Sequence, residues 1–284
     1  MGAKTSGANN KGDIVTNLDD LIDSYRRQGY PSFLAISSAC QDVLIAKIAA
    51  SPLNRNVTIK GGVLMHSLSG SERRATRDFD LDFLRYPLTE EGIDRFIEAV
   101  SAAGDNISIK RVGEIEELSQ QDYKGKRVHV IISDGARSVT TKLDIGVQSD
   151  LDVEQEEFFF DISDQEESIN LLANSKEQVF GEKLASLLKW GVGSTRFKDI
   201  HDFYYLGHRP DFNRELLDIF LDKWIYSNDA AWLPMTDAQG ISEGLSAIFQ
   251  DDIYQRGLAS SQDKWLDIDD DKATKWLIGY FANL

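Results

Sequence analysis

The spacing of hydrophobic residues changes along this chain. Apolar side chains recur every three to four residues near the start, which predicts amphipathic helices at 17–28 and 31–50. Further helices are expected at 62–68 and 89–103. From residue 175 onward the helical spacing dominates and predicts helices at 176–190, 196–207, 212–226, 241–256 and 270–282.

Short runs rich in β-branched and aromatic residues predict strands between these helices. They lie at 57–59, 79–84, 107–111, 127–133 and 139–147. Asp134-Gly135, between the last two runs, is a hairpin signal. The acidic stretch 148–174 has little periodicity and predicts a loop with one short strand at 157–160.

The order of these elements predicts three parts. Residues 1–12 are small and polar and are expected to form a flexible N-terminus. An α/β domain is expected over 13–174, and a helical domain over 175–284. No run of eighteen apolar residues occurs, so we expect a cytoplasmic protein without a membrane partner. Cys40 is the single cysteine, which excludes an intramolecular disulfide and a cysteine-based zinc cluster.

Charge is distributed unevenly. The net charge is −16, but residues 148–178 alone carry ten acidic and one basic residue, and residues 211–284 carry fourteen and six. The rest of the chain is close to neutral. This pattern speaks against broad, non-specific nucleic-acid binding and leaves a polyanionic substrate possible near the basic residues of the neutral part.

Two glycines and three aspartates lie in that neutral part. Gly61-Gly62 follows the strand-like run 57–59, and glycines let backbone N–H groups approach phosphate oxygens. Asp78 and Asp80 alternate on the next strand and therefore point to one face, where both can hold a hard cation. Asp144 lies on a further strand. Asp82 continues the alternation and is expected at the edge of the site.

The helical half adds basic residues. Lys183 lies in the first turns of the helix predicted at 176–190, and Arg196 and Asp199 follow at a helical spacing of three. Such a pair is also common on solvated helix surfaces. Lys189 and Lys198 are weaker candidates for the same site.

These residues, in this order, resemble the AbiEii-type nucleotidyltransferase toxins of type IV toxin–antitoxin systems, which include the MenT-like toxins. The resemblance covers about 30–206 and rests on six motifs: Lys60-Gly61-Gly62, Arg74-Ala75-Thr76-Arg77-Asp78-Phe79-Asp80-Leu81, Tyr123-Lys124-Gly125, Leu143-Asp144-Ile145-Gly146, Glu182-Lys183-Leu184 and Arg196-Phe197-Lys198-Asp199-Ile200-His201-Asp202. Val63 replaces a threonine that the family often has after its glycine pair.

The resemblance implies an α+β fold, with a polymerase-β-like nucleotidyltransferase domain built on a mixed sheet and followed by a helical C-terminal half. It implies transfer of a nucleoside monophosphate from an NTP to RNA, with the 3′ end of tRNA as the expected acceptor, and a block of translation. A separately encoded antitoxin is the expected partner.

Phosphoryl-transfer chemistry assigns roles to the residues. Asp78 and Asp80 are expected to bind Mg²⁺ or Mn²⁺, and Asp144 to bind a second metal or to activate the attacking hydroxyl. Asp199 is expected to orient Arg196 or Lys183, with direct participation in catalysis left open. Phosphate contacts are expected from Gly61, Gly62, Thr76, Lys183 and Arg196, and RNA contacts from Arg73, Arg74 and Arg77.

Two other functions remain open at this point. A nucleotidyltransferase that modifies a small-molecule hydroxyl would suit the acidic charge. A non-catalytic interaction module could keep the same fold, although Asp78, Asp80 and Asp144 speak against it.

Overall fold

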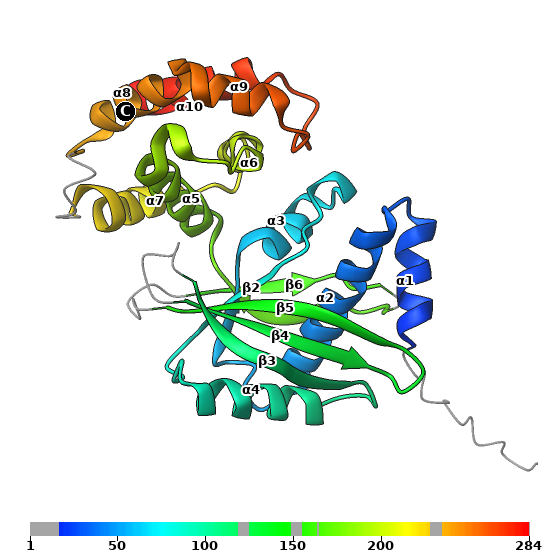
Figure 1. The fold of residues 1–284 in the computed structure, drawn as a ribbon. Helices are drawn as coiled ribbons and strands as arrows, with labels where there is room; N and C mark the ends of the chain where they lie inside the picture. Colours follow the sequence, from blue (N-terminus) through cyan, green and yellow to red (C-terminus); the bar gives the residue numbers. More distant parts are fainter. Residues whose placement is uncertain (1–16, 119–124, 149–154, 164, 228–234, 284) are drawn as a thin grey trace, which may run out of the picture.

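The computed structural model describes residues 17–118, 125–148, 155–163, 165–227 and 235–283. A seven-stranded mixed sheet, in the order β3-β4-β5-β2-β1-β7-β6, forms its centre (Figure 1). The strands are β1 (Val57–Ile59), β2 (Phe79–Phe83), β3 (Ser108–Leu118), β4 (Gly125–Ser133), β5 (Ser138–Val147), β6 (Glu156–Phe160) and β7 (Ile169–Ala173). Pairs β2–β5 and β1–β7 are parallel, and the other neighbours are antiparallel.

One face of the sheet is covered by helices of the N-terminal part. They are α1 (Leu18–Arg27), α2 (Ser32–Ala50) and α4 (Glu90–Ala102), while α3 (Gly61–Ser69) and the turn η1 (Glu72–Arg74) connect β1 to β2. The alternation of side chains along β4 explains why helices cover only one face of the sheet here. Val128, Val130 and Ile132 point to the helix side and are fully buried. The intervening Arg127, His129 and Ile131 point to the opposite face, which is open over β3, β4 and β5 in Figure 1.

Helix α2 is long and apolar enough to cross a membrane by length and composition alone. In the fold, however, most of α2 is buried, and it packs against α1, α4 and the sheet. Its two buried charged residues have partners. Asp42 accepts a hydrogen bond from the Tyr25 hydroxyl at 2.8 Å, and Lys47 Nζ donates to the carbonyl of Ala103 at 2.7 Å. These features are those of a core helix.

The second half of the chain is helical and lies above one end of the sheet in Figure 1. Its elements are α5 (Lys176–Trp190), η2 (Gly191–Gly193), α6 (Lys198–Gly207), α7 (Arg214–Leu221), the π-helical turn η3 (Asp222–Tyr226), α8 (Ala238–Gln250), α9 (Asp252–Ser260) and α10 (Asp270–Ala282). The single helix expected over 241–256 is wrong. Asp251 is extended, and its side chain accepts a hydrogen bond from the backbone N–H of Ile253, which ends α8 and begins α9.

The observed architecture confirms an α+β fold with a mixed sheet followed by helices. Strand β7 was not predicted, since 148–174 was expected to hold one strand only. The sheet ends at Ala173 and α5 begins at Lys176, while the division into domains 13–174 and 175–284 stays a prediction. The expected flexible segment 1–12 lies outside the described residues.

Candidate functional site

Neighbouring strands bring the three predicted aspartates to one place. In the parallel pair β2–β5, Asp80 lies directly opposite Asp144. Asp78 precedes β2 by one residue and therefore points to the same face as Asp80. We call Asp78, Asp80 and Asp144 the carboxylate wall.

The glycine turn lies against this wall. Gly61 begins α3 with φ +63°, and a Cβ there would lie 2.2 Å from Oδ2 of Asp80. A Cβ on Gly62 would lie 2.6 Å from Oγ1 of Thr76. Both positions therefore require glycine, for contact with the site and, at Gly61, also for backbone conformation. The Gly62 N–H donates to Asp80 Oδ2 at 3.3 Å, so the start of α3 directs its amide toward the site.

The opposite side of the site is basic and comes mainly from α5, α6 and η1. Lys183 Nζ lies 2.5 Å from Asp199 Oδ1 and 3.0 Å from Asp202 Oδ2. Arg196 Nε donates to Asp199 Oδ2 at 2.7 Å. Arg74 donates to both oxygens of Asp202, at 2.6 and 2.7 Å. Three cations thus share two carboxylates, while Lys198 Nζ donates to the Ala75 carbonyl at 3.1 Å. We call this group the cationic wall: Arg74, Lys183, Arg196, Lys198, Asp199 and Asp202.

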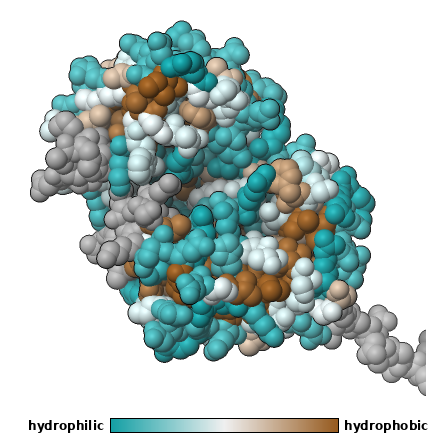
Figure 2. Space-filling view, in the orientation of Figure 1, coloured by the Kyte–Doolittle hydropathy of each residue, from teal (hydrophilic) through white to brown (hydrophobic). Residues whose placement is uncertain are grey.

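A cavity of about 370 Å³ separates the two walls. Its lining includes every residue predicted to act in catalysis or nucleotide binding, namely Gly61, Gly62, Thr76, Asp78, Asp80, Asp144, Lys183, Arg196 and Asp199. Figure 2, in the orientation of Figure 1, shows the helical part and the sheet part meeting along an indented boundary. The individual roles of these residues stay predictions.

The carboxylate wall carries electrostatic repulsion that its own cations relieve only in part. Burial, together with the nearby charges of Asp144 and Asp78, raises the pKa of Asp80. Arg127 donates to both oxygens of Asp144, at 2.8 and 2.7 Å, and Lys142 Nζ lies 2.8 Å from Asp78 Oδ1. An additional cation at this wall would therefore be stabilised.

The carboxylate wall fits a hard divalent cation, because its donors are oxygens and Asp144 lies directly opposite Asp80 in the β2–β5 pair. Among the described residues, no group of three metal-ligating side chains already forms a coordination site. Two of the three carboxylates are already held by ion pairs, Asp144 by Arg127 and Asp78 by Lys142. A metal that binds all three would have to replace these cations.

On the cationic wall, the ion pairs shift the pKa values of the groups that form them. Burial alone would raise the pKa of Asp202, but Arg74 and Lys183 outweigh burial and hold that pKa well below its usual range. The Asp199 carboxylate raises the pKa of Arg196. Burial and the charge of Arg74 lower the pKa of Lys198. The wall thus holds more positive than negative charge, as expected of a phosphate-binding surface.

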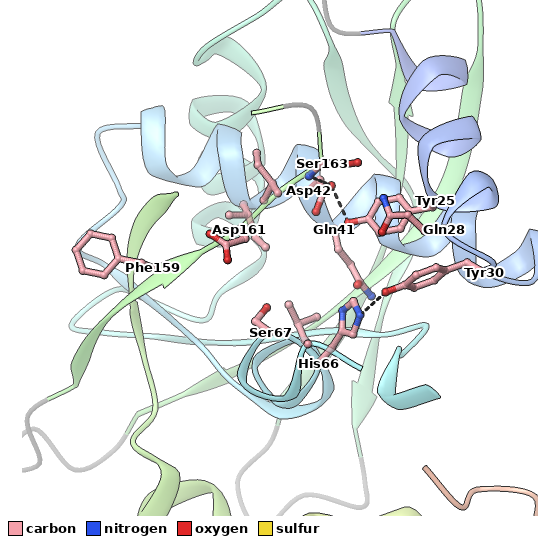
Figure 3. Close-up of a pocket in the computed structure, with 14 residues that line it drawn as sticks. Tyr25, Gln28, Tyr30, Gln41, Asp42, His66, Ser67, Phe159, Asp161 and Ser163 are labelled. Atoms are coloured by element: carbon pink, nitrogen blue, oxygen red, sulfur yellow. Dashed lines mark hydrogen bonds between the residues drawn. The ribbon is translucent and has the colours of Figure 1, made fainter. Parts of the chain in front are cut away.

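A second cavity, of about 330 Å³, lies among α1, α2, the C-terminal half of α3 and the segment after β6 (Figure 3). Asp42 and Asp161 line it, and Tyr30 and His66 are joined by a 2.8 Å hydrogen bond between Oη and Nε2. No lysine or arginine is among its described lining residues. It therefore lacks the positive charge that a triphosphate needs.

The three arginines predicted to contact RNA do not share one surface, and their contact with RNA stays a prediction. Arg73 and Arg77 are exposed, and Arg73 pairs with Asp267 at 2.7 Å while Arg77 lies over the Phe33 ring at 4.3 Å. Arg74 is only 3% exposed and belongs to the cationic wall. Residues 73 and 74 are consecutive in the tight turn η1, so their side chains point in different directions.

Asp82 also differs from expectation. It is fully buried, and one of its oxygens lies 2.8 Å from Lys60 Nζ, so it is not an acid at the edge of the cavity.

Sequence reasoning missed three residues that line or support the cavity. Arg127 was treated only as the start of a strand, and Asp202 only as part of a motif. Trp190 was not singled out. The signal for Arg127 is its alternation on β4, which places it across from Asp144 in the antiparallel pair β4–β5.

The sheet, the carboxylate wall and the helical half together define a nucleotidyltransferase-like α+β protein. Two solved structures from Helicobacter pylori share this fold. Protein JHP933 is 16% identical, with a TM-score of 0.51 over 89% of this chain and 92% of that one. A putative nucleotidyltransferase is 14% identical, with a TM-score of 0.50 over 93% and 94%.

The family comparison is more specific than the fold. The model for the AbiEii nucleotidyltransferase toxins of type IV toxin–antitoxin systems matches residues 42–277, and the chain belongs to this family. No curated protein matches the chain. The matched range begins within α2 and ends within α10, so it includes both walls of the cavity.

Proposed function

We propose that this chain is a metal-dependent toxin that transfers a nucleoside monophosphate from an NTP to the 3′ end of an RNA, with tRNA as the acceptor, and so blocks translation. The observation that carries the proposal is the cavity itself, where three aspartates face four cations. Attack on an α-phosphate requires both, since the nucleophile must be activated and the charge of the triphosphate balanced.

The cationic wall would hold the triphosphate. Lys183 and Arg196 already lie at the cavity, and each is positioned there by Asp199. Gly61 and Gly62 would bring the backbone at the start of α3 close to phosphate oxygens, with Thr76 beside them. In this proposal Asp199 is a positioning residue for both cations.

The carboxylate wall would hold Mg²⁺ or Mn²⁺ through Asp78, Asp80 and Asp144. When bound, such ions neutralise phosphate charge and lower the pKa of an attacking hydroxyl. Asp144 lies across from Asp80 at the side of Arg127, and it would accept the proton of the hydroxyl or help to hold the second ion.

An RNA would approach over exposed basic residues. Arg73 and Arg77 remain candidates for backbone contacts, because an exposed pair such as Arg73–Asp267 is weak and can exchange its carboxylate for a phosphate. Arg74 would act on the triphosphate side instead. An antitoxin encoded separately would counteract the activity, which we expect in the cytoplasm, where NTPs and tRNA occur.

Incubation of the protein with each labelled NTP, Mg²⁺ and total RNA tests the proposal. We expect label to appear in RNA of tRNA size, to disappear with a chelator, and to depend on a free 3′ hydroxyl. Label transferred only to a small molecule would favour the small-molecule alternative. Absence of transfer to any acceptor, with intact NTP, would contradict enzymatic function.

A further inference from the structure

One large aromatic residue lies half-exposed at the rim of the catalytic cavity. Trp190 is 46% exposed, and it is both the last residue of α5 and part of the cavity lining. Gly191 follows with φ +52° and ends the helix there. The indole ring therefore lies at the edge of the helix, beside the opening of the cavity.

The face of α5 that lines the cavity runs from Lys183 through Ser186 to Trp190. These positions are separated by three and four residues, so they lie on one side of the helix. Seven residues correspond to about 10.5 Å along the axis at 1.5 Å per residue. The same helix face thus presents a buried cation at one end and an exposed aromatic ring at the other.

This arrangement matches the two ends of a nucleotide. A nucleoside triphosphate has a polyanionic end and a flat aromatic base. With its phosphates between Lys183 and the carboxylate wall, its base would extend toward the rim. A tryptophan ring is a large flat stacking surface, and such a contact tolerates any base because every base has a π-face.

We propose that the indole ring of Trp190 is a stacking platform for a nucleobase, and that the base belongs to the NTP whose triphosphate lies along Lys183. This inference rests on the proposed function and adds a binding residue for the nucleoside. The terminal base of the acceptor RNA has the same chemistry, and the experiment below distinguishes the two sources.

The test measures binding of two probes to the full chain in the presence of Ca²⁺, which replaces Mg²⁺ to suppress turnover. One probe is the NTP that supports transfer, and the other is inorganic tripolyphosphate, which has no base. Trp190→Ala should weaken NTP binding about tenfold, equivalent to about 1.4 kcal/mol, and leave tripolyphosphate binding unchanged. Trp190→Phe should restore most of the NTP affinity.

Phe159→Ala is the matched control, because Phe159 is also an exposed aromatic residue (62%) but lines the second cavity (Figure 3). It should change neither affinity. Melting temperatures of all variants check that each is folded, since a half-exposed residue contributes little to the core.

Each result of these binding measurements contradicts a different part of the proposal. Equal NTP affinity of Trp190→Ala and wild type overturns the assignment to the NTP. If the KM for RNA then rises, the ring stacks on the acceptor base. An equal loss for NTP and tripolyphosphate would show a distorted phosphate site and overturn stacking. A wild-type protein that binds neither probe contradicts the proposed function itself.

Discussion

Asp80 is a carboxylate in an environment that disfavours its negative charge. Its carboxylate lies beside Asp144 and Asp78, receives the Gly62 N–H, and has a raised pKa because of burial and its acidic neighbours. A residue held in this way costs stability in the protein without a cation and becomes favourable only when positive charge arrives.

Asp80→Asn is therefore expected to separate activity from folding. The amide keeps the shape and can still accept the Gly62 hydrogen bond, while mutual repulsion disappears. Nucleotide transfer should fall more than a hundredfold, since losing a metal ligand removes about 3 kcal/mol or more of transition-state stabilisation. The melting temperature without metal should stay equal or rise. A variant that retains full transfer would contradict the role of Asp80 as metal ligand, and a clear fall in melting temperature would contradict the repulsion argument.

His66 gives the molecule a defined pH response. Burial and the charges of Arg74 and Lys198 lower the pKa of His66 to about 4, so it is neutral in the folded protein at neutral pH. The unfolded chain takes up this proton near pH 6.5. Between these values the unfolded state binds more protons, so stability falls as the pH decreases from about 6.5 to about 4.

His66→Gln should flatten that part of the pH profile. Urea unfolding at several pH values between 4 and 7 measures the slope, and His208→Gln, at an exposed histidine outside both cavities, controls for general effects of the substitution. If wild type and His66→Gln lose stability in parallel over this range, the assignment to His66 is wrong.

At the scale of elements, η1 connects the sheet part to the helical part through two adjacent arginines in different environments. The Arg74–Asp202 pair is almost fully buried, with the Trp265 indole N–H also donating to Asp202 at 2.9 Å. The Arg73–Asp267 pair is 45% and 93% exposed. The two pairs form an internal comparison of buried and exposed ion pairs.

Arg74→Met should destabilise the protein by about 3 kcal/mol or more, because it leaves part of the Asp202 charge buried without its main partner. Arg73→Met should cost less than about 1 kcal/mol. Chemical denaturation of both variants gives the comparison. Similar costs for the two substitutions would show that Asp202 is satisfied by Lys183 and Trp265 alone.

The elements also show how far sequence reasoning reaches. Periodicity predicted α2, α5, α10 and the β4–β5 hairpin because each is a local pattern of apolar residues. Strand β7 is a run of five residues at the end of a mostly acidic segment with little periodicity, which is why it was missed. Its antiparallel partner β6 is near in sequence, whereas its parallel partner β1 lies more than one hundred residues earlier. In the same way, alternation put Asp78 and Asp80 on one face, whereas the contact of Arg127 with Asp144 depends on the register of two strands.

Over the whole molecule, negative charge restricts where a nucleic acid can bind. The net charge is −16, yet the cationic wall lines the cavity and Lys142 pairs with Asp78 of the carboxylate wall, while Arg73 and Arg77 are exposed in the segment that leads into β2. The face in Figure 2 is hydrophilic over much of its area, with a band of apolar residues across the sheet part and an apolar patch on the helical part. Recognition of RNA should therefore depend on an end that enters the cavity and not on a long tract of backbone.

This expectation has a measurable form. The logarithm of RNA affinity should fall with the logarithm of salt concentration along a shallow slope, with about −0.7 to −0.9 contributed by each phosphate contacted. Titrations of tRNA and of random duplex at several salt concentrations measure it. Arg73→Glu with Arg77→Glu should weaken tRNA binding more than NTP binding. A steep slope, or equal affinity for random duplex, would contradict end recognition.

The ion pairs at the carboxylate wall have a consequence for the order of events. Lys142 and Arg127 already form ion pairs with Asp78 and Asp144, so a free divalent ion must displace both side chains before it can bind all three carboxylates. An ion that arrives with a nucleotide brings phosphates that can take over both displaced side chains. Under the proposed function we therefore expect ordered addition, in which the metal–nucleotide complex binds as a unit and the acceptor follows.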